Sequence, residues 1–186
     1  MSARKNRVCP VALAGHLDSR FRRWIQNPYK ILGPYLHEGM VVLDVGCGPG
    51  YFSTAITQMV GPGGHVIAAD LQEGMLGKLK RKIQGSSLEE RISLHQCRTD
   101  KVGVAEPVDF VLLFYVVHEV PDIEPLFNEL AAILKSNGVI FIAEPPFHVS
   151  RKAFEGMIQT AARNGLTVVE RPKLLLSKAV ILGKHF

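Results

Sequence analysis

The sequence contains few cysteines and no long apolar run. Its three cysteines, Cys9, Cys47 and Cys97, cannot all pair, and none lies in a Cys-x-x-Cys motif. We therefore expect a reduced, cytoplasmic setting. No apolar stretch approaches the roughly 18 residues that a membrane-spanning helix needs. The apolar stretch at 8–15 is short and contains Pro10, which argues against a signal peptide.

Acidic residues are nearly absent from the beginning of the chain. Residues 1–23 contain six lysines or arginines and one acidic residue, Asp18, whereas the rest has 16 basic and 16 acidic residues. The net charge of +5 therefore belongs to an N-terminal arm. Such an arm suits an anionic substrate, RNA or a membrane surface, or is a solvated chain end. With 186 residues, 47% of them hydrophobic, the chain can bury one core and hardly two. We expect a basic arm at 1–24 and one domain at 25–186.

Helices and strands alternate along this domain, as a doubly wound parallel sheet requires. The expected strands cover 41–45, 65–70, 92–97, 108–116 and 139–144, and the expected helices cover 72–84, 123–134 and 151–164, with a further helix from Tyr51 and two short helical pieces within 20–37. We expect Asp122 to cap the helix at 123–134, residues 135–138 to end it, and Gly165 to end the last helix. The final strands, at 167–174 and 178–183, are too close in sequence for a crossover helix and must run antiparallel.

A glycine loop after the first strand is the most informative motif. The run Val41-Val-Leu-Asp-Val opens into Gly46-x-Gly48-x-Gly50, and glycines at alternate positions let the backbone approach a bulky ligand. The helix that follows points its N-terminus at that ligand. Nicotinamide and flavin folds use Gly-x-Gly-x-x-Gly, but here Tyr51 stands at the third glycine position.

The second strand ends in a carboxylate, Asp70, twenty residues after Gly50. An acidic side chain can accept hydrogen bonds from both hydroxyls of a ribose, and dinucleotide sites place one at this point. The alternative is that Asp70 caps the helix that begins near Gln72.

The pattern Asp44-x-Gly46-x-Gly48-x-Gly50 resembles the first motif of class I S-adenosylmethionine-dependent methyltransferases. The resemblance runs from about residue 25 to the C-terminus. It implies an α/β fold: a Rossmann-like, three-layer α/β/α arrangement around a doubly wound seven-stranded sheet of order 3-2-1-4-5-7-6, with strand 7 antiparallel. The chain is most similar to small stand-alone members akin to the quinone-biosynthesis and arsenite methyltransferase-like group. Arsenite activity itself is disfavoured, because arsenic would need a cluster of thiolates and the three cysteines are scattered in sequence.

The resemblance implies S-adenosyl-L-methionine as cofactor and S-adenosyl-L-homocysteine as product. The glycine loop would line the methionine part, with Asp44 orienting the loop or the amino group. Asp70 would hold the ribose, the next residues would cover the adenine, and the end of the third strand would contact the adenine amino edge. Aromatic residues leaving the fourth strand would border the methyl carbon or belong to the core. The implied cofactor-binding residues are Asp44, Gly46, Cys47, Gly48, Gly50, Asp70, Leu71, Met75, Cys97, Arg98, Asp100, Phe114 and Tyr115.

The implied reaction is an in-line displacement on the methyl carbon. Alignment of the reactants supplies most of the rate in such a reaction, up to roughly 7 to 11 kcal/mol in model systems. If the nucleophile arrives protonated, the candidate catalytic base is His118, with Glu119 as the alternative; His118 otherwise hydrogen-bonds the loop. Glu144 and His148 follow the fifth strand on the same rim, where they either bound the acceptor pocket or serve the structure. His95 and Cys97 alone do not make a metal site, so we predict no metal.

The segment after the fourth strand bears on the acceptor. Nucleic-acid base modifiers of the superfamily often carry Asn-Pro-Pro-Tyr or Asp-Pro-Pro-Tyr there, whereas this chain has Tyr115-Val-Val-His118. A small-molecule methyl acceptor is therefore favoured over a nucleic acid. Two other hypotheses stay open: a cofactor-binding protein without catalysis that acts through a partner, and an NAD(P)-dependent oxidoreductase.

Overall fold

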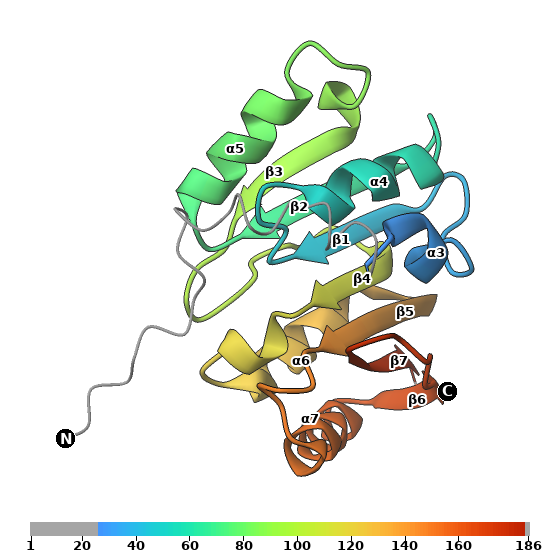
Figure 1. The fold of residues 1–186 in the computed structure, drawn as a ribbon, viewed down its shortest axis with the longest axis vertical. Helices are drawn as coiled ribbons and strands as arrows, with labels where there is room; N and C mark the ends of the chain where they lie inside the picture. The colour runs from blue at the N-terminus through green and yellow to red at the C-terminus, as the bar shows by residue number, and fades with distance from the viewer. Residues whose placement is uncertain (1–25, 185–186) are drawn as a thin grey trace, which may run out of the picture.

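A computed structural model describes residues 26–184 and shows one seven-stranded sheet of order β3-β2-β1-β4-β5-β7-β6 (Figure 1). In this view green β3 lies toward the top of the sheet and red-orange β6 at the bottom, with blue β1 and yellow-green β4 in the middle. The strands are β1 Val41–Val45, β2 His65–Asp70, β3 Ile92–Gln96, β4 Val108–Phe114, β5 Leu134–Glu144, β6 Leu166–Glu170 and β7 Lys178–Lys184. The helices are α3 Pro28–Leu32, α4 Tyr51–Met59, α5 Glu73–Ile83, α6 Ile123–Ile133 and α7 Arg151–Arg163, with 3-10 turns η2 Glu89–Arg91 and η3 Val117–Glu119.

The order and the directions of the strands are those that the resemblance implies. The strands β1 to β5 pair in parallel, whereas β7 runs antiparallel to both β5 and β6. The prediction of an antiparallel ending is confirmed. All five carboxyl ends of the parallel strands consequently meet at one edge, which is where open α/β sheets bind ligands.

Helices cover both faces of the sheet, because its central strands are apolar on both sides. Along β4, Phe110 and Leu112 pack with residues of α3, α4 and α5, whereas Val111 and Leu113 pack with residues of α6 and α7. All four β4 side chains are fully buried. The predicted three-layer α/β/α class is confirmed.

Two expected features are confirmed at helix ends. Asp122 caps α6, because its carboxylate accepts a hydrogen bond of 3.1 Å from the backbone N–H of Glu124. Gly165 follows α7 with φ of 77°, a conformation that glycine adopts without strain.

Among the described residues, no helix is long and apolar enough to cross a membrane.

Some boundaries differ from the expectation. Residues 135–138 do not form a loop after α6; they lie within β5, whose pairing with β4 shifts register between Val108 and Phe110. Gly138 permits this strand pairing because it has no Cβ. A Cβ at this position would lie 2.8 Å from the Leu134 side chain and 3.0 Å from the Asp109 carbonyl oxygen, which is too close for a normal contact. β6 ends at Glu170 instead of residue 174.

Other boundaries shift by one or two residues. The expected helices shorten to α5, α6 and α7, and the third strand ends at Gln96. β4 ends at Phe114 because Tyr115 has a φ of 64°, outside the extended region. Of the two helical pieces expected within 20–37, the structure shows α3, and the earlier one lies outside the described residues, as does the basic arm.

Candidate functional site

A cavity of about 1640 Å³ opens at the carboxyl edge of the parallel strands. It is lined by residues at or directly after the ends of β1 to β5, by η3 and by the N-terminal halves of α4, α6 and α7. Pockets for one drug-sized ligand usually measure about 300 to 1,000 Å³. The cavity therefore has room for two small ligands side by side.

The three loop glycines have different roles, although each has a positive φ. A Cβ on Gly46 would lie 2.3 Å from a methyl group of Val116, and one on Gly50 would lie 2.2 Å from a methyl group of Leu79. A Cβ on Gly48 would meet nothing within 4 Å. Gly46 and Gly48 line the cavity and Gly50 does not. Gly50 thus allows α4 and α5 to pack closely, and Gly48 leaves backbone open to a ligand.

Asp70 joins this loop to the start of α5. Its Oδ2 accepts a hydrogen bond of 2.9 Å from the N–H of Gly48, and its Oδ1 accepts one of 2.8 Å from the N–H of Gln72. The residue is 7% exposed, and burial raises the pKa of its carboxyl. The alternative that Asp70 caps the helix is wrong, because the N-cap of α5 is Gln72 and no side chain caps this helix. The bond to Gln72 holds the segment before α5, and the bond to Gly48 holds the glycine loop.

Asp44 and the two described cysteines near the glycine loop are also shielded from water. Asp44 is 2% exposed and accepts a hydrogen bond of 2.6 Å from the hydroxyl of Ser53 in α4. Burial, with nearby carboxylates as a lesser cause, raises the pKa of the Cys47 thiol strongly and that of Cys97 to about 12. Both thiols are therefore neutral at physiological pH and act as small apolar groups.

Residues after β2 and β3 form one end of the cavity. Leu71, Met75, Cys97, Arg98 and Asp100 all line it. Met75 is buried, whereas Arg98 and Asp100 are exposed and form an ion pair of 3.1 Å between Nε and Oδ1. A hydrogen bond from its own backbone, followed by that from Arg98, lowers the pKa of Asp100.

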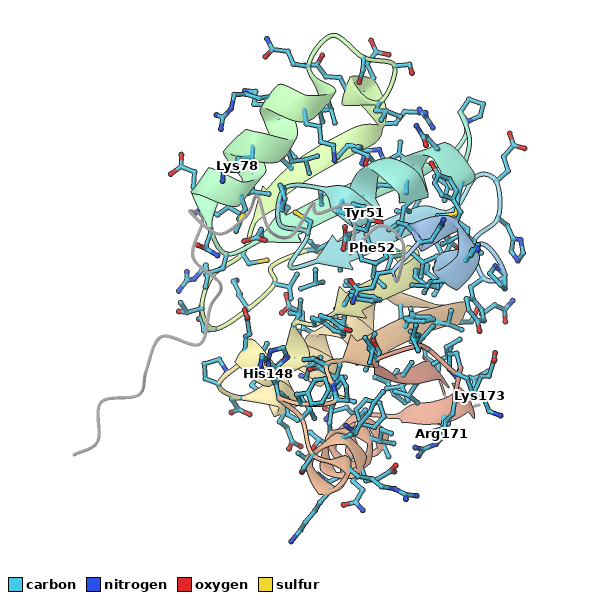
Figure 2. All side chains as sticks on the ribbon, viewed as in Figure 1. Tyr51, Phe52, Lys78, His148, Arg171 and Lys173 are labelled. Atoms are coloured by element: carbon cyan, nitrogen blue, oxygen red, sulfur yellow. The ribbon has the colours of Figure 1, made fainter. Side chains whose placement is uncertain are left out.

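Aromatic rings form the middle of the site. The Phe114 ring lies 4.4 Å from that of Phe52 and 4.7 Å from that of Tyr115, centre to centre. Phe114 is both core and cavity wall, being 6% exposed. Figure 2 shows Tyr51 and Phe52 together at the start of α4.

The Tyr115 hydroxyl connects three distant segments. It accepts a hydrogen bond of 2.8 Å from Nε2 of Gln26 and lies 2.6 Å from the hydroxyl of Ser177 and 3.1 Å from the carbonyl oxygen of Leu176. Tyr115 thereby holds the segment before β7 and the start of the described chain at the cavity rim.

Two histidines and two carboxylates form the opposite end of the cavity from β3. His118, in η3, has its Nδ1 at 2.5 Å from Oε2 of Glu144, which is 1% exposed. His148 lies beside them, with ring centres 5.9 Å apart, and Figure 2 places it next to the segment between β4 and α6. Glu119 also lines this end.

Comparison with known proteins agrees with this geometry. A family profile described as a methyltransferase domain matches residues 36–175, three quarters of the chain. The chain belongs to the methyltransferase-domain family. This membership confirms the predicted resemblance to class I methyltransferases.

Curated relatives and a solved structure show how far the similarity extends. The domain is 32% identical to demethylmenaquinone methyltransferase of Lactobacillus johnsonii, over 57% of this chain and 44% of the relative. It is 30% identical to demethylmenaquinone methyltransferase of Halalkalibacterium halodurans, over 67% of this chain and 50% of the relative. The chain thus spans about half the length of the curated relatives it matches. A crystal structure of a SAM dependent methyltransferase from Aquifex aeolicus superposes with a TM-score of 0.82 at 24% identity, covering 94% of this chain and 98% of that one.

The structure brings fourteen of the predicted site residues to the cavity of this methyltransferase domain; Gly50 is the exception. It also adds residues that sequence patterns did not indicate, including Gln26, Phe52 and Leu176. Gln26 and Leu176 come from segments with no motif, and Phe52 looked like any apolar residue of a helix. The partnership of Glu144 with His118 could not be found from sequence, because it depends on how β4 and β5 end beside each other.

Proposed function

We propose that this methyltransferase domain binds S-adenosyl-L-methionine in the cavity and transfers its methyl group to a small-molecule acceptor. The observation that supports this most is the pairing of Gly48 with Asp70. An open stretch of backbone lies there beside a buried carboxylate. When bound, the cofactor supplies a methyl group that its sulfonium already activates, and S-adenosyl-L-homocysteine is the product. The residues of the chain then have to hold the acceptor in line with that group.

The cofactor would occupy the half of the cavity that the glycine loop, β2 and β3 form. Asp70 would accept hydrogen bonds from the ribose hydroxyls, and Asp44 would orient the loop through Ser53. Leu71 and Met75 would cover the adenine, and its amino edge would meet the segment from Cys97 to Asp100. Phe114 and Tyr115 would border the methyl carbon. Gly50 would support this site through its packing on Leu79 rather than by contact with the cofactor.

The acceptor would occupy the half beyond Tyr115. The size of the cavity and the names of the curated relatives favour a small molecule over a nucleic acid. His118 and Glu119 are the candidate catalytic residues there. The cysteine pattern supports a cytoplasmic setting. The basic arm at 1–24 suits an anionic substrate, RNA or a membrane surface, or is a solvated chain end.

Calorimetric titration tests the cofactor. We expect S-adenosylmethionine and S-adenosylhomocysteine to bind with about micromolar affinity and the two nicotinamide dinucleotides not to bind. An Asp70→Ala variant should lose roughly 1.5 to 3 kcal/mol of binding free energy, the cost of a hydrogen bond to a charged group. Binding of a dinucleotide alone would contradict the proposal. Absence of binding by all four would favour a protein that works through a partner without catalysis.

A further inference from the structure

Glu144 is the most deeply buried charged side chain at the acceptor end of the cavity. It ends β5 and is 1% exposed. Its Oε1 accepts a hydrogen bond of 2.9 Å from the N–H of Val117, and its Oε2 lies 2.5 Å from Nδ1 of His118. A carboxylate this buried is stable only when its oxygens are hydrogen-bonded. Both of its oxygens are committed to η3, the turn that carries His118.

This contact determines which ring nitrogen of His118 carries the proton. An ionised carboxylate only accepts hydrogen bonds, so Nδ1 of the neutral imidazole must be the donor. Nε2 then carries the lone pair and is the nitrogen that can take up a proton. His118 lines the cavity with 23% of its side chain exposed, whereas Glu144 is too buried to exchange protons with a ligand directly.

The surroundings of His118 indicate what kind of molecule gives up that proton. Among the residues that the structure describes, the titratable groups near it include Glu144 on β5, Glu119 on the same turn and His148 on the β5–α7 connection. Lys178 of β7 pairs in register with Glu144 and donates hydrogen bonds to the carbonyl oxygens of Pro146 and Val149. Glu119 and Glu144 line the cavity whereas Lys178 does not, so the nearby charge disfavours an anionic acceptor. Much of the remaining wall is apolar, including Val120, Leu126, Val149 and Met157. A neutral, largely apolar molecule fits this end, and a base beside it would serve an acceptor whose nucleophilic atom carries a proton.

We propose that Glu144 positions His118 as the proton acceptor for an apolar acceptor molecule with a weakly acidic hydroxyl group, such as a phenol or a hydroquinone. This inference rests on the proposed methyl transfer. The hydroxyl gives its proton to Nε2 of His118, and the oxygen lone pair forms the bond to the methyl carbon. The bond from that carbon to sulfur breaks, and its electron pair stays on sulfur. Glu144 is a positioning residue, because it acts through His118.

The rates of methylation of two naphthols distinguish a role of His118 in proton removal from a purely structural role. At a pH where 1-naphthol is neutral and 4-nitro-1-naphthol is an anion, only the first needs a base. With 1-naphthol, we expect His118→Gln to lower kcat about 10²- to 10⁴-fold, the usual contribution of a general base, and Glu144→Gln to lower it at least about tenfold. With the anionic naphthol, the kcat of both variants should stay within about threefold of that of the unchanged protein, whereas the KM of Glu144→Gln should fall, because this variant lacks one of the carboxylates that disfavour an anion. His65→Gln, at the far end of β2 from the cavity, is the control and should change neither rate.

An NMR measurement tests the positioning without any acceptor. In protein labelled with ¹⁵N-histidine, we expect His118 to show a protonated Nδ1 and an unprotonated Nε2, and Glu144→Gln to abolish that pattern. If the pattern survives in Glu144→Gln, Glu144 does not position His118. If the variants lose rate equally with both naphthols, His118 does not act as the proton acceptor. If the protein binds S-adenosylmethionine but methylates neither naphthol nor 1,4-naphthohydroquinone, the acceptor class is wrong. Failure to bind S-adenosylmethionine would instead refute the proposed function.

Discussion

A buried carboxylate with two backbone hydrogen bonds still has lone pairs to offer. Asp70 illustrates this, since an ionised carboxylate provides about four acceptor positions and the loop and helix N–H groups use two. Although Asp70 does not cap α5, its bond to Gln72 is compatible with the proposed role as ribose ligand. The backbone bonds hold the carboxylate in place, and the remaining positions can serve a ligand.

The first prediction concerns the pH dependence of binding at Asp70. Burial raises the pKa of its carboxyl in the folded protein, whereas hydrogen bonds from ribose hydroxyls favour the ionised form. Below that raised pKa, binding must release a proton, so the affinity for S-adenosylhomocysteine should fall as pH decreases, by at most about tenfold per pH unit. Calorimetry over a pH series would show this for the unchanged protein. Asp70→Asn should bind more weakly and without this dependence; a parallel pH dependence in the variant would assign the proton elsewhere.

The second prediction separates the loop glycines. Gly50→Ala should lower the free energy of unfolding by about 2 to 4 kcal/mol, because the new methyl group collides with Leu79 and the residue has a positive φ. Gly48→Ala should lower it by only about 1 to 2 kcal/mol, since its methyl group meets open space. That methyl group instead narrows the cavity and should weaken binding of S-adenosylhomocysteine. Denaturant titration and calorimetry on both variants give the comparison, and equal stability losses would contradict it.

At the scale of elements, the end of β4 controls the rim of the cavity. Its backbone leaves the strand at Tyr115 in a left-handed conformation, which turns the ring toward Gln26 and Ser177. The next residues form η3 and place His118 against β5. One irregular strand end thus positions both the aromatic rim and the candidate base.

The third prediction tests this connection. Tyr115→Phe removes the hydroxyl that bonds the Gln26 side chain and the segment before β7, and should cost about 1 to 3 kcal/mol of stability. Amide exchange at residues 174–177 should become faster, because that segment loses its link to β4. Tyr29→Phe is the matched control, since the Tyr29 hydroxyl contacts Gln58 at the surface. Equal exchange rates in the two variants would show that the Tyr115 hydroxyl does not hold this segment.

At the scale of the whole molecule, the expected domain should fold without the basic arm. We predict that a protein of residues 25–186 unfolds cooperatively and binds S-adenosylhomocysteine as the full chain does. At a ligand concentration of about 100 times Kd, binding adds roughly 2.7 kcal/mol of stability. For a domain of this size, that corresponds to a rise in Tm of about 5 to 11 °C. Thermal unfolding with and without ligand measures it. A shortened protein that fails to fold would show that the arm belongs to the domain.

The apolar strands, the glycine spacing and the acidic end of β2 were predictable from sequence, because each depends on residues close together in the chain. Short apolar runs and turn residues specify the local backbone conformation. The order of the strands in the sheet was instead implied by the resemblance to class I methyltransferases. The β5 start was not predictable, since residues 135–138 join a strand only because Gly138 lets the backbone pass Leu134 and Asp109. The contacts of Tyr115 with Gln26 and of His118 with Glu144 likewise join residues far apart in sequence. Such pairs depend on the direction of each strand end and on the register of the sheet, which the tertiary structure alone determines.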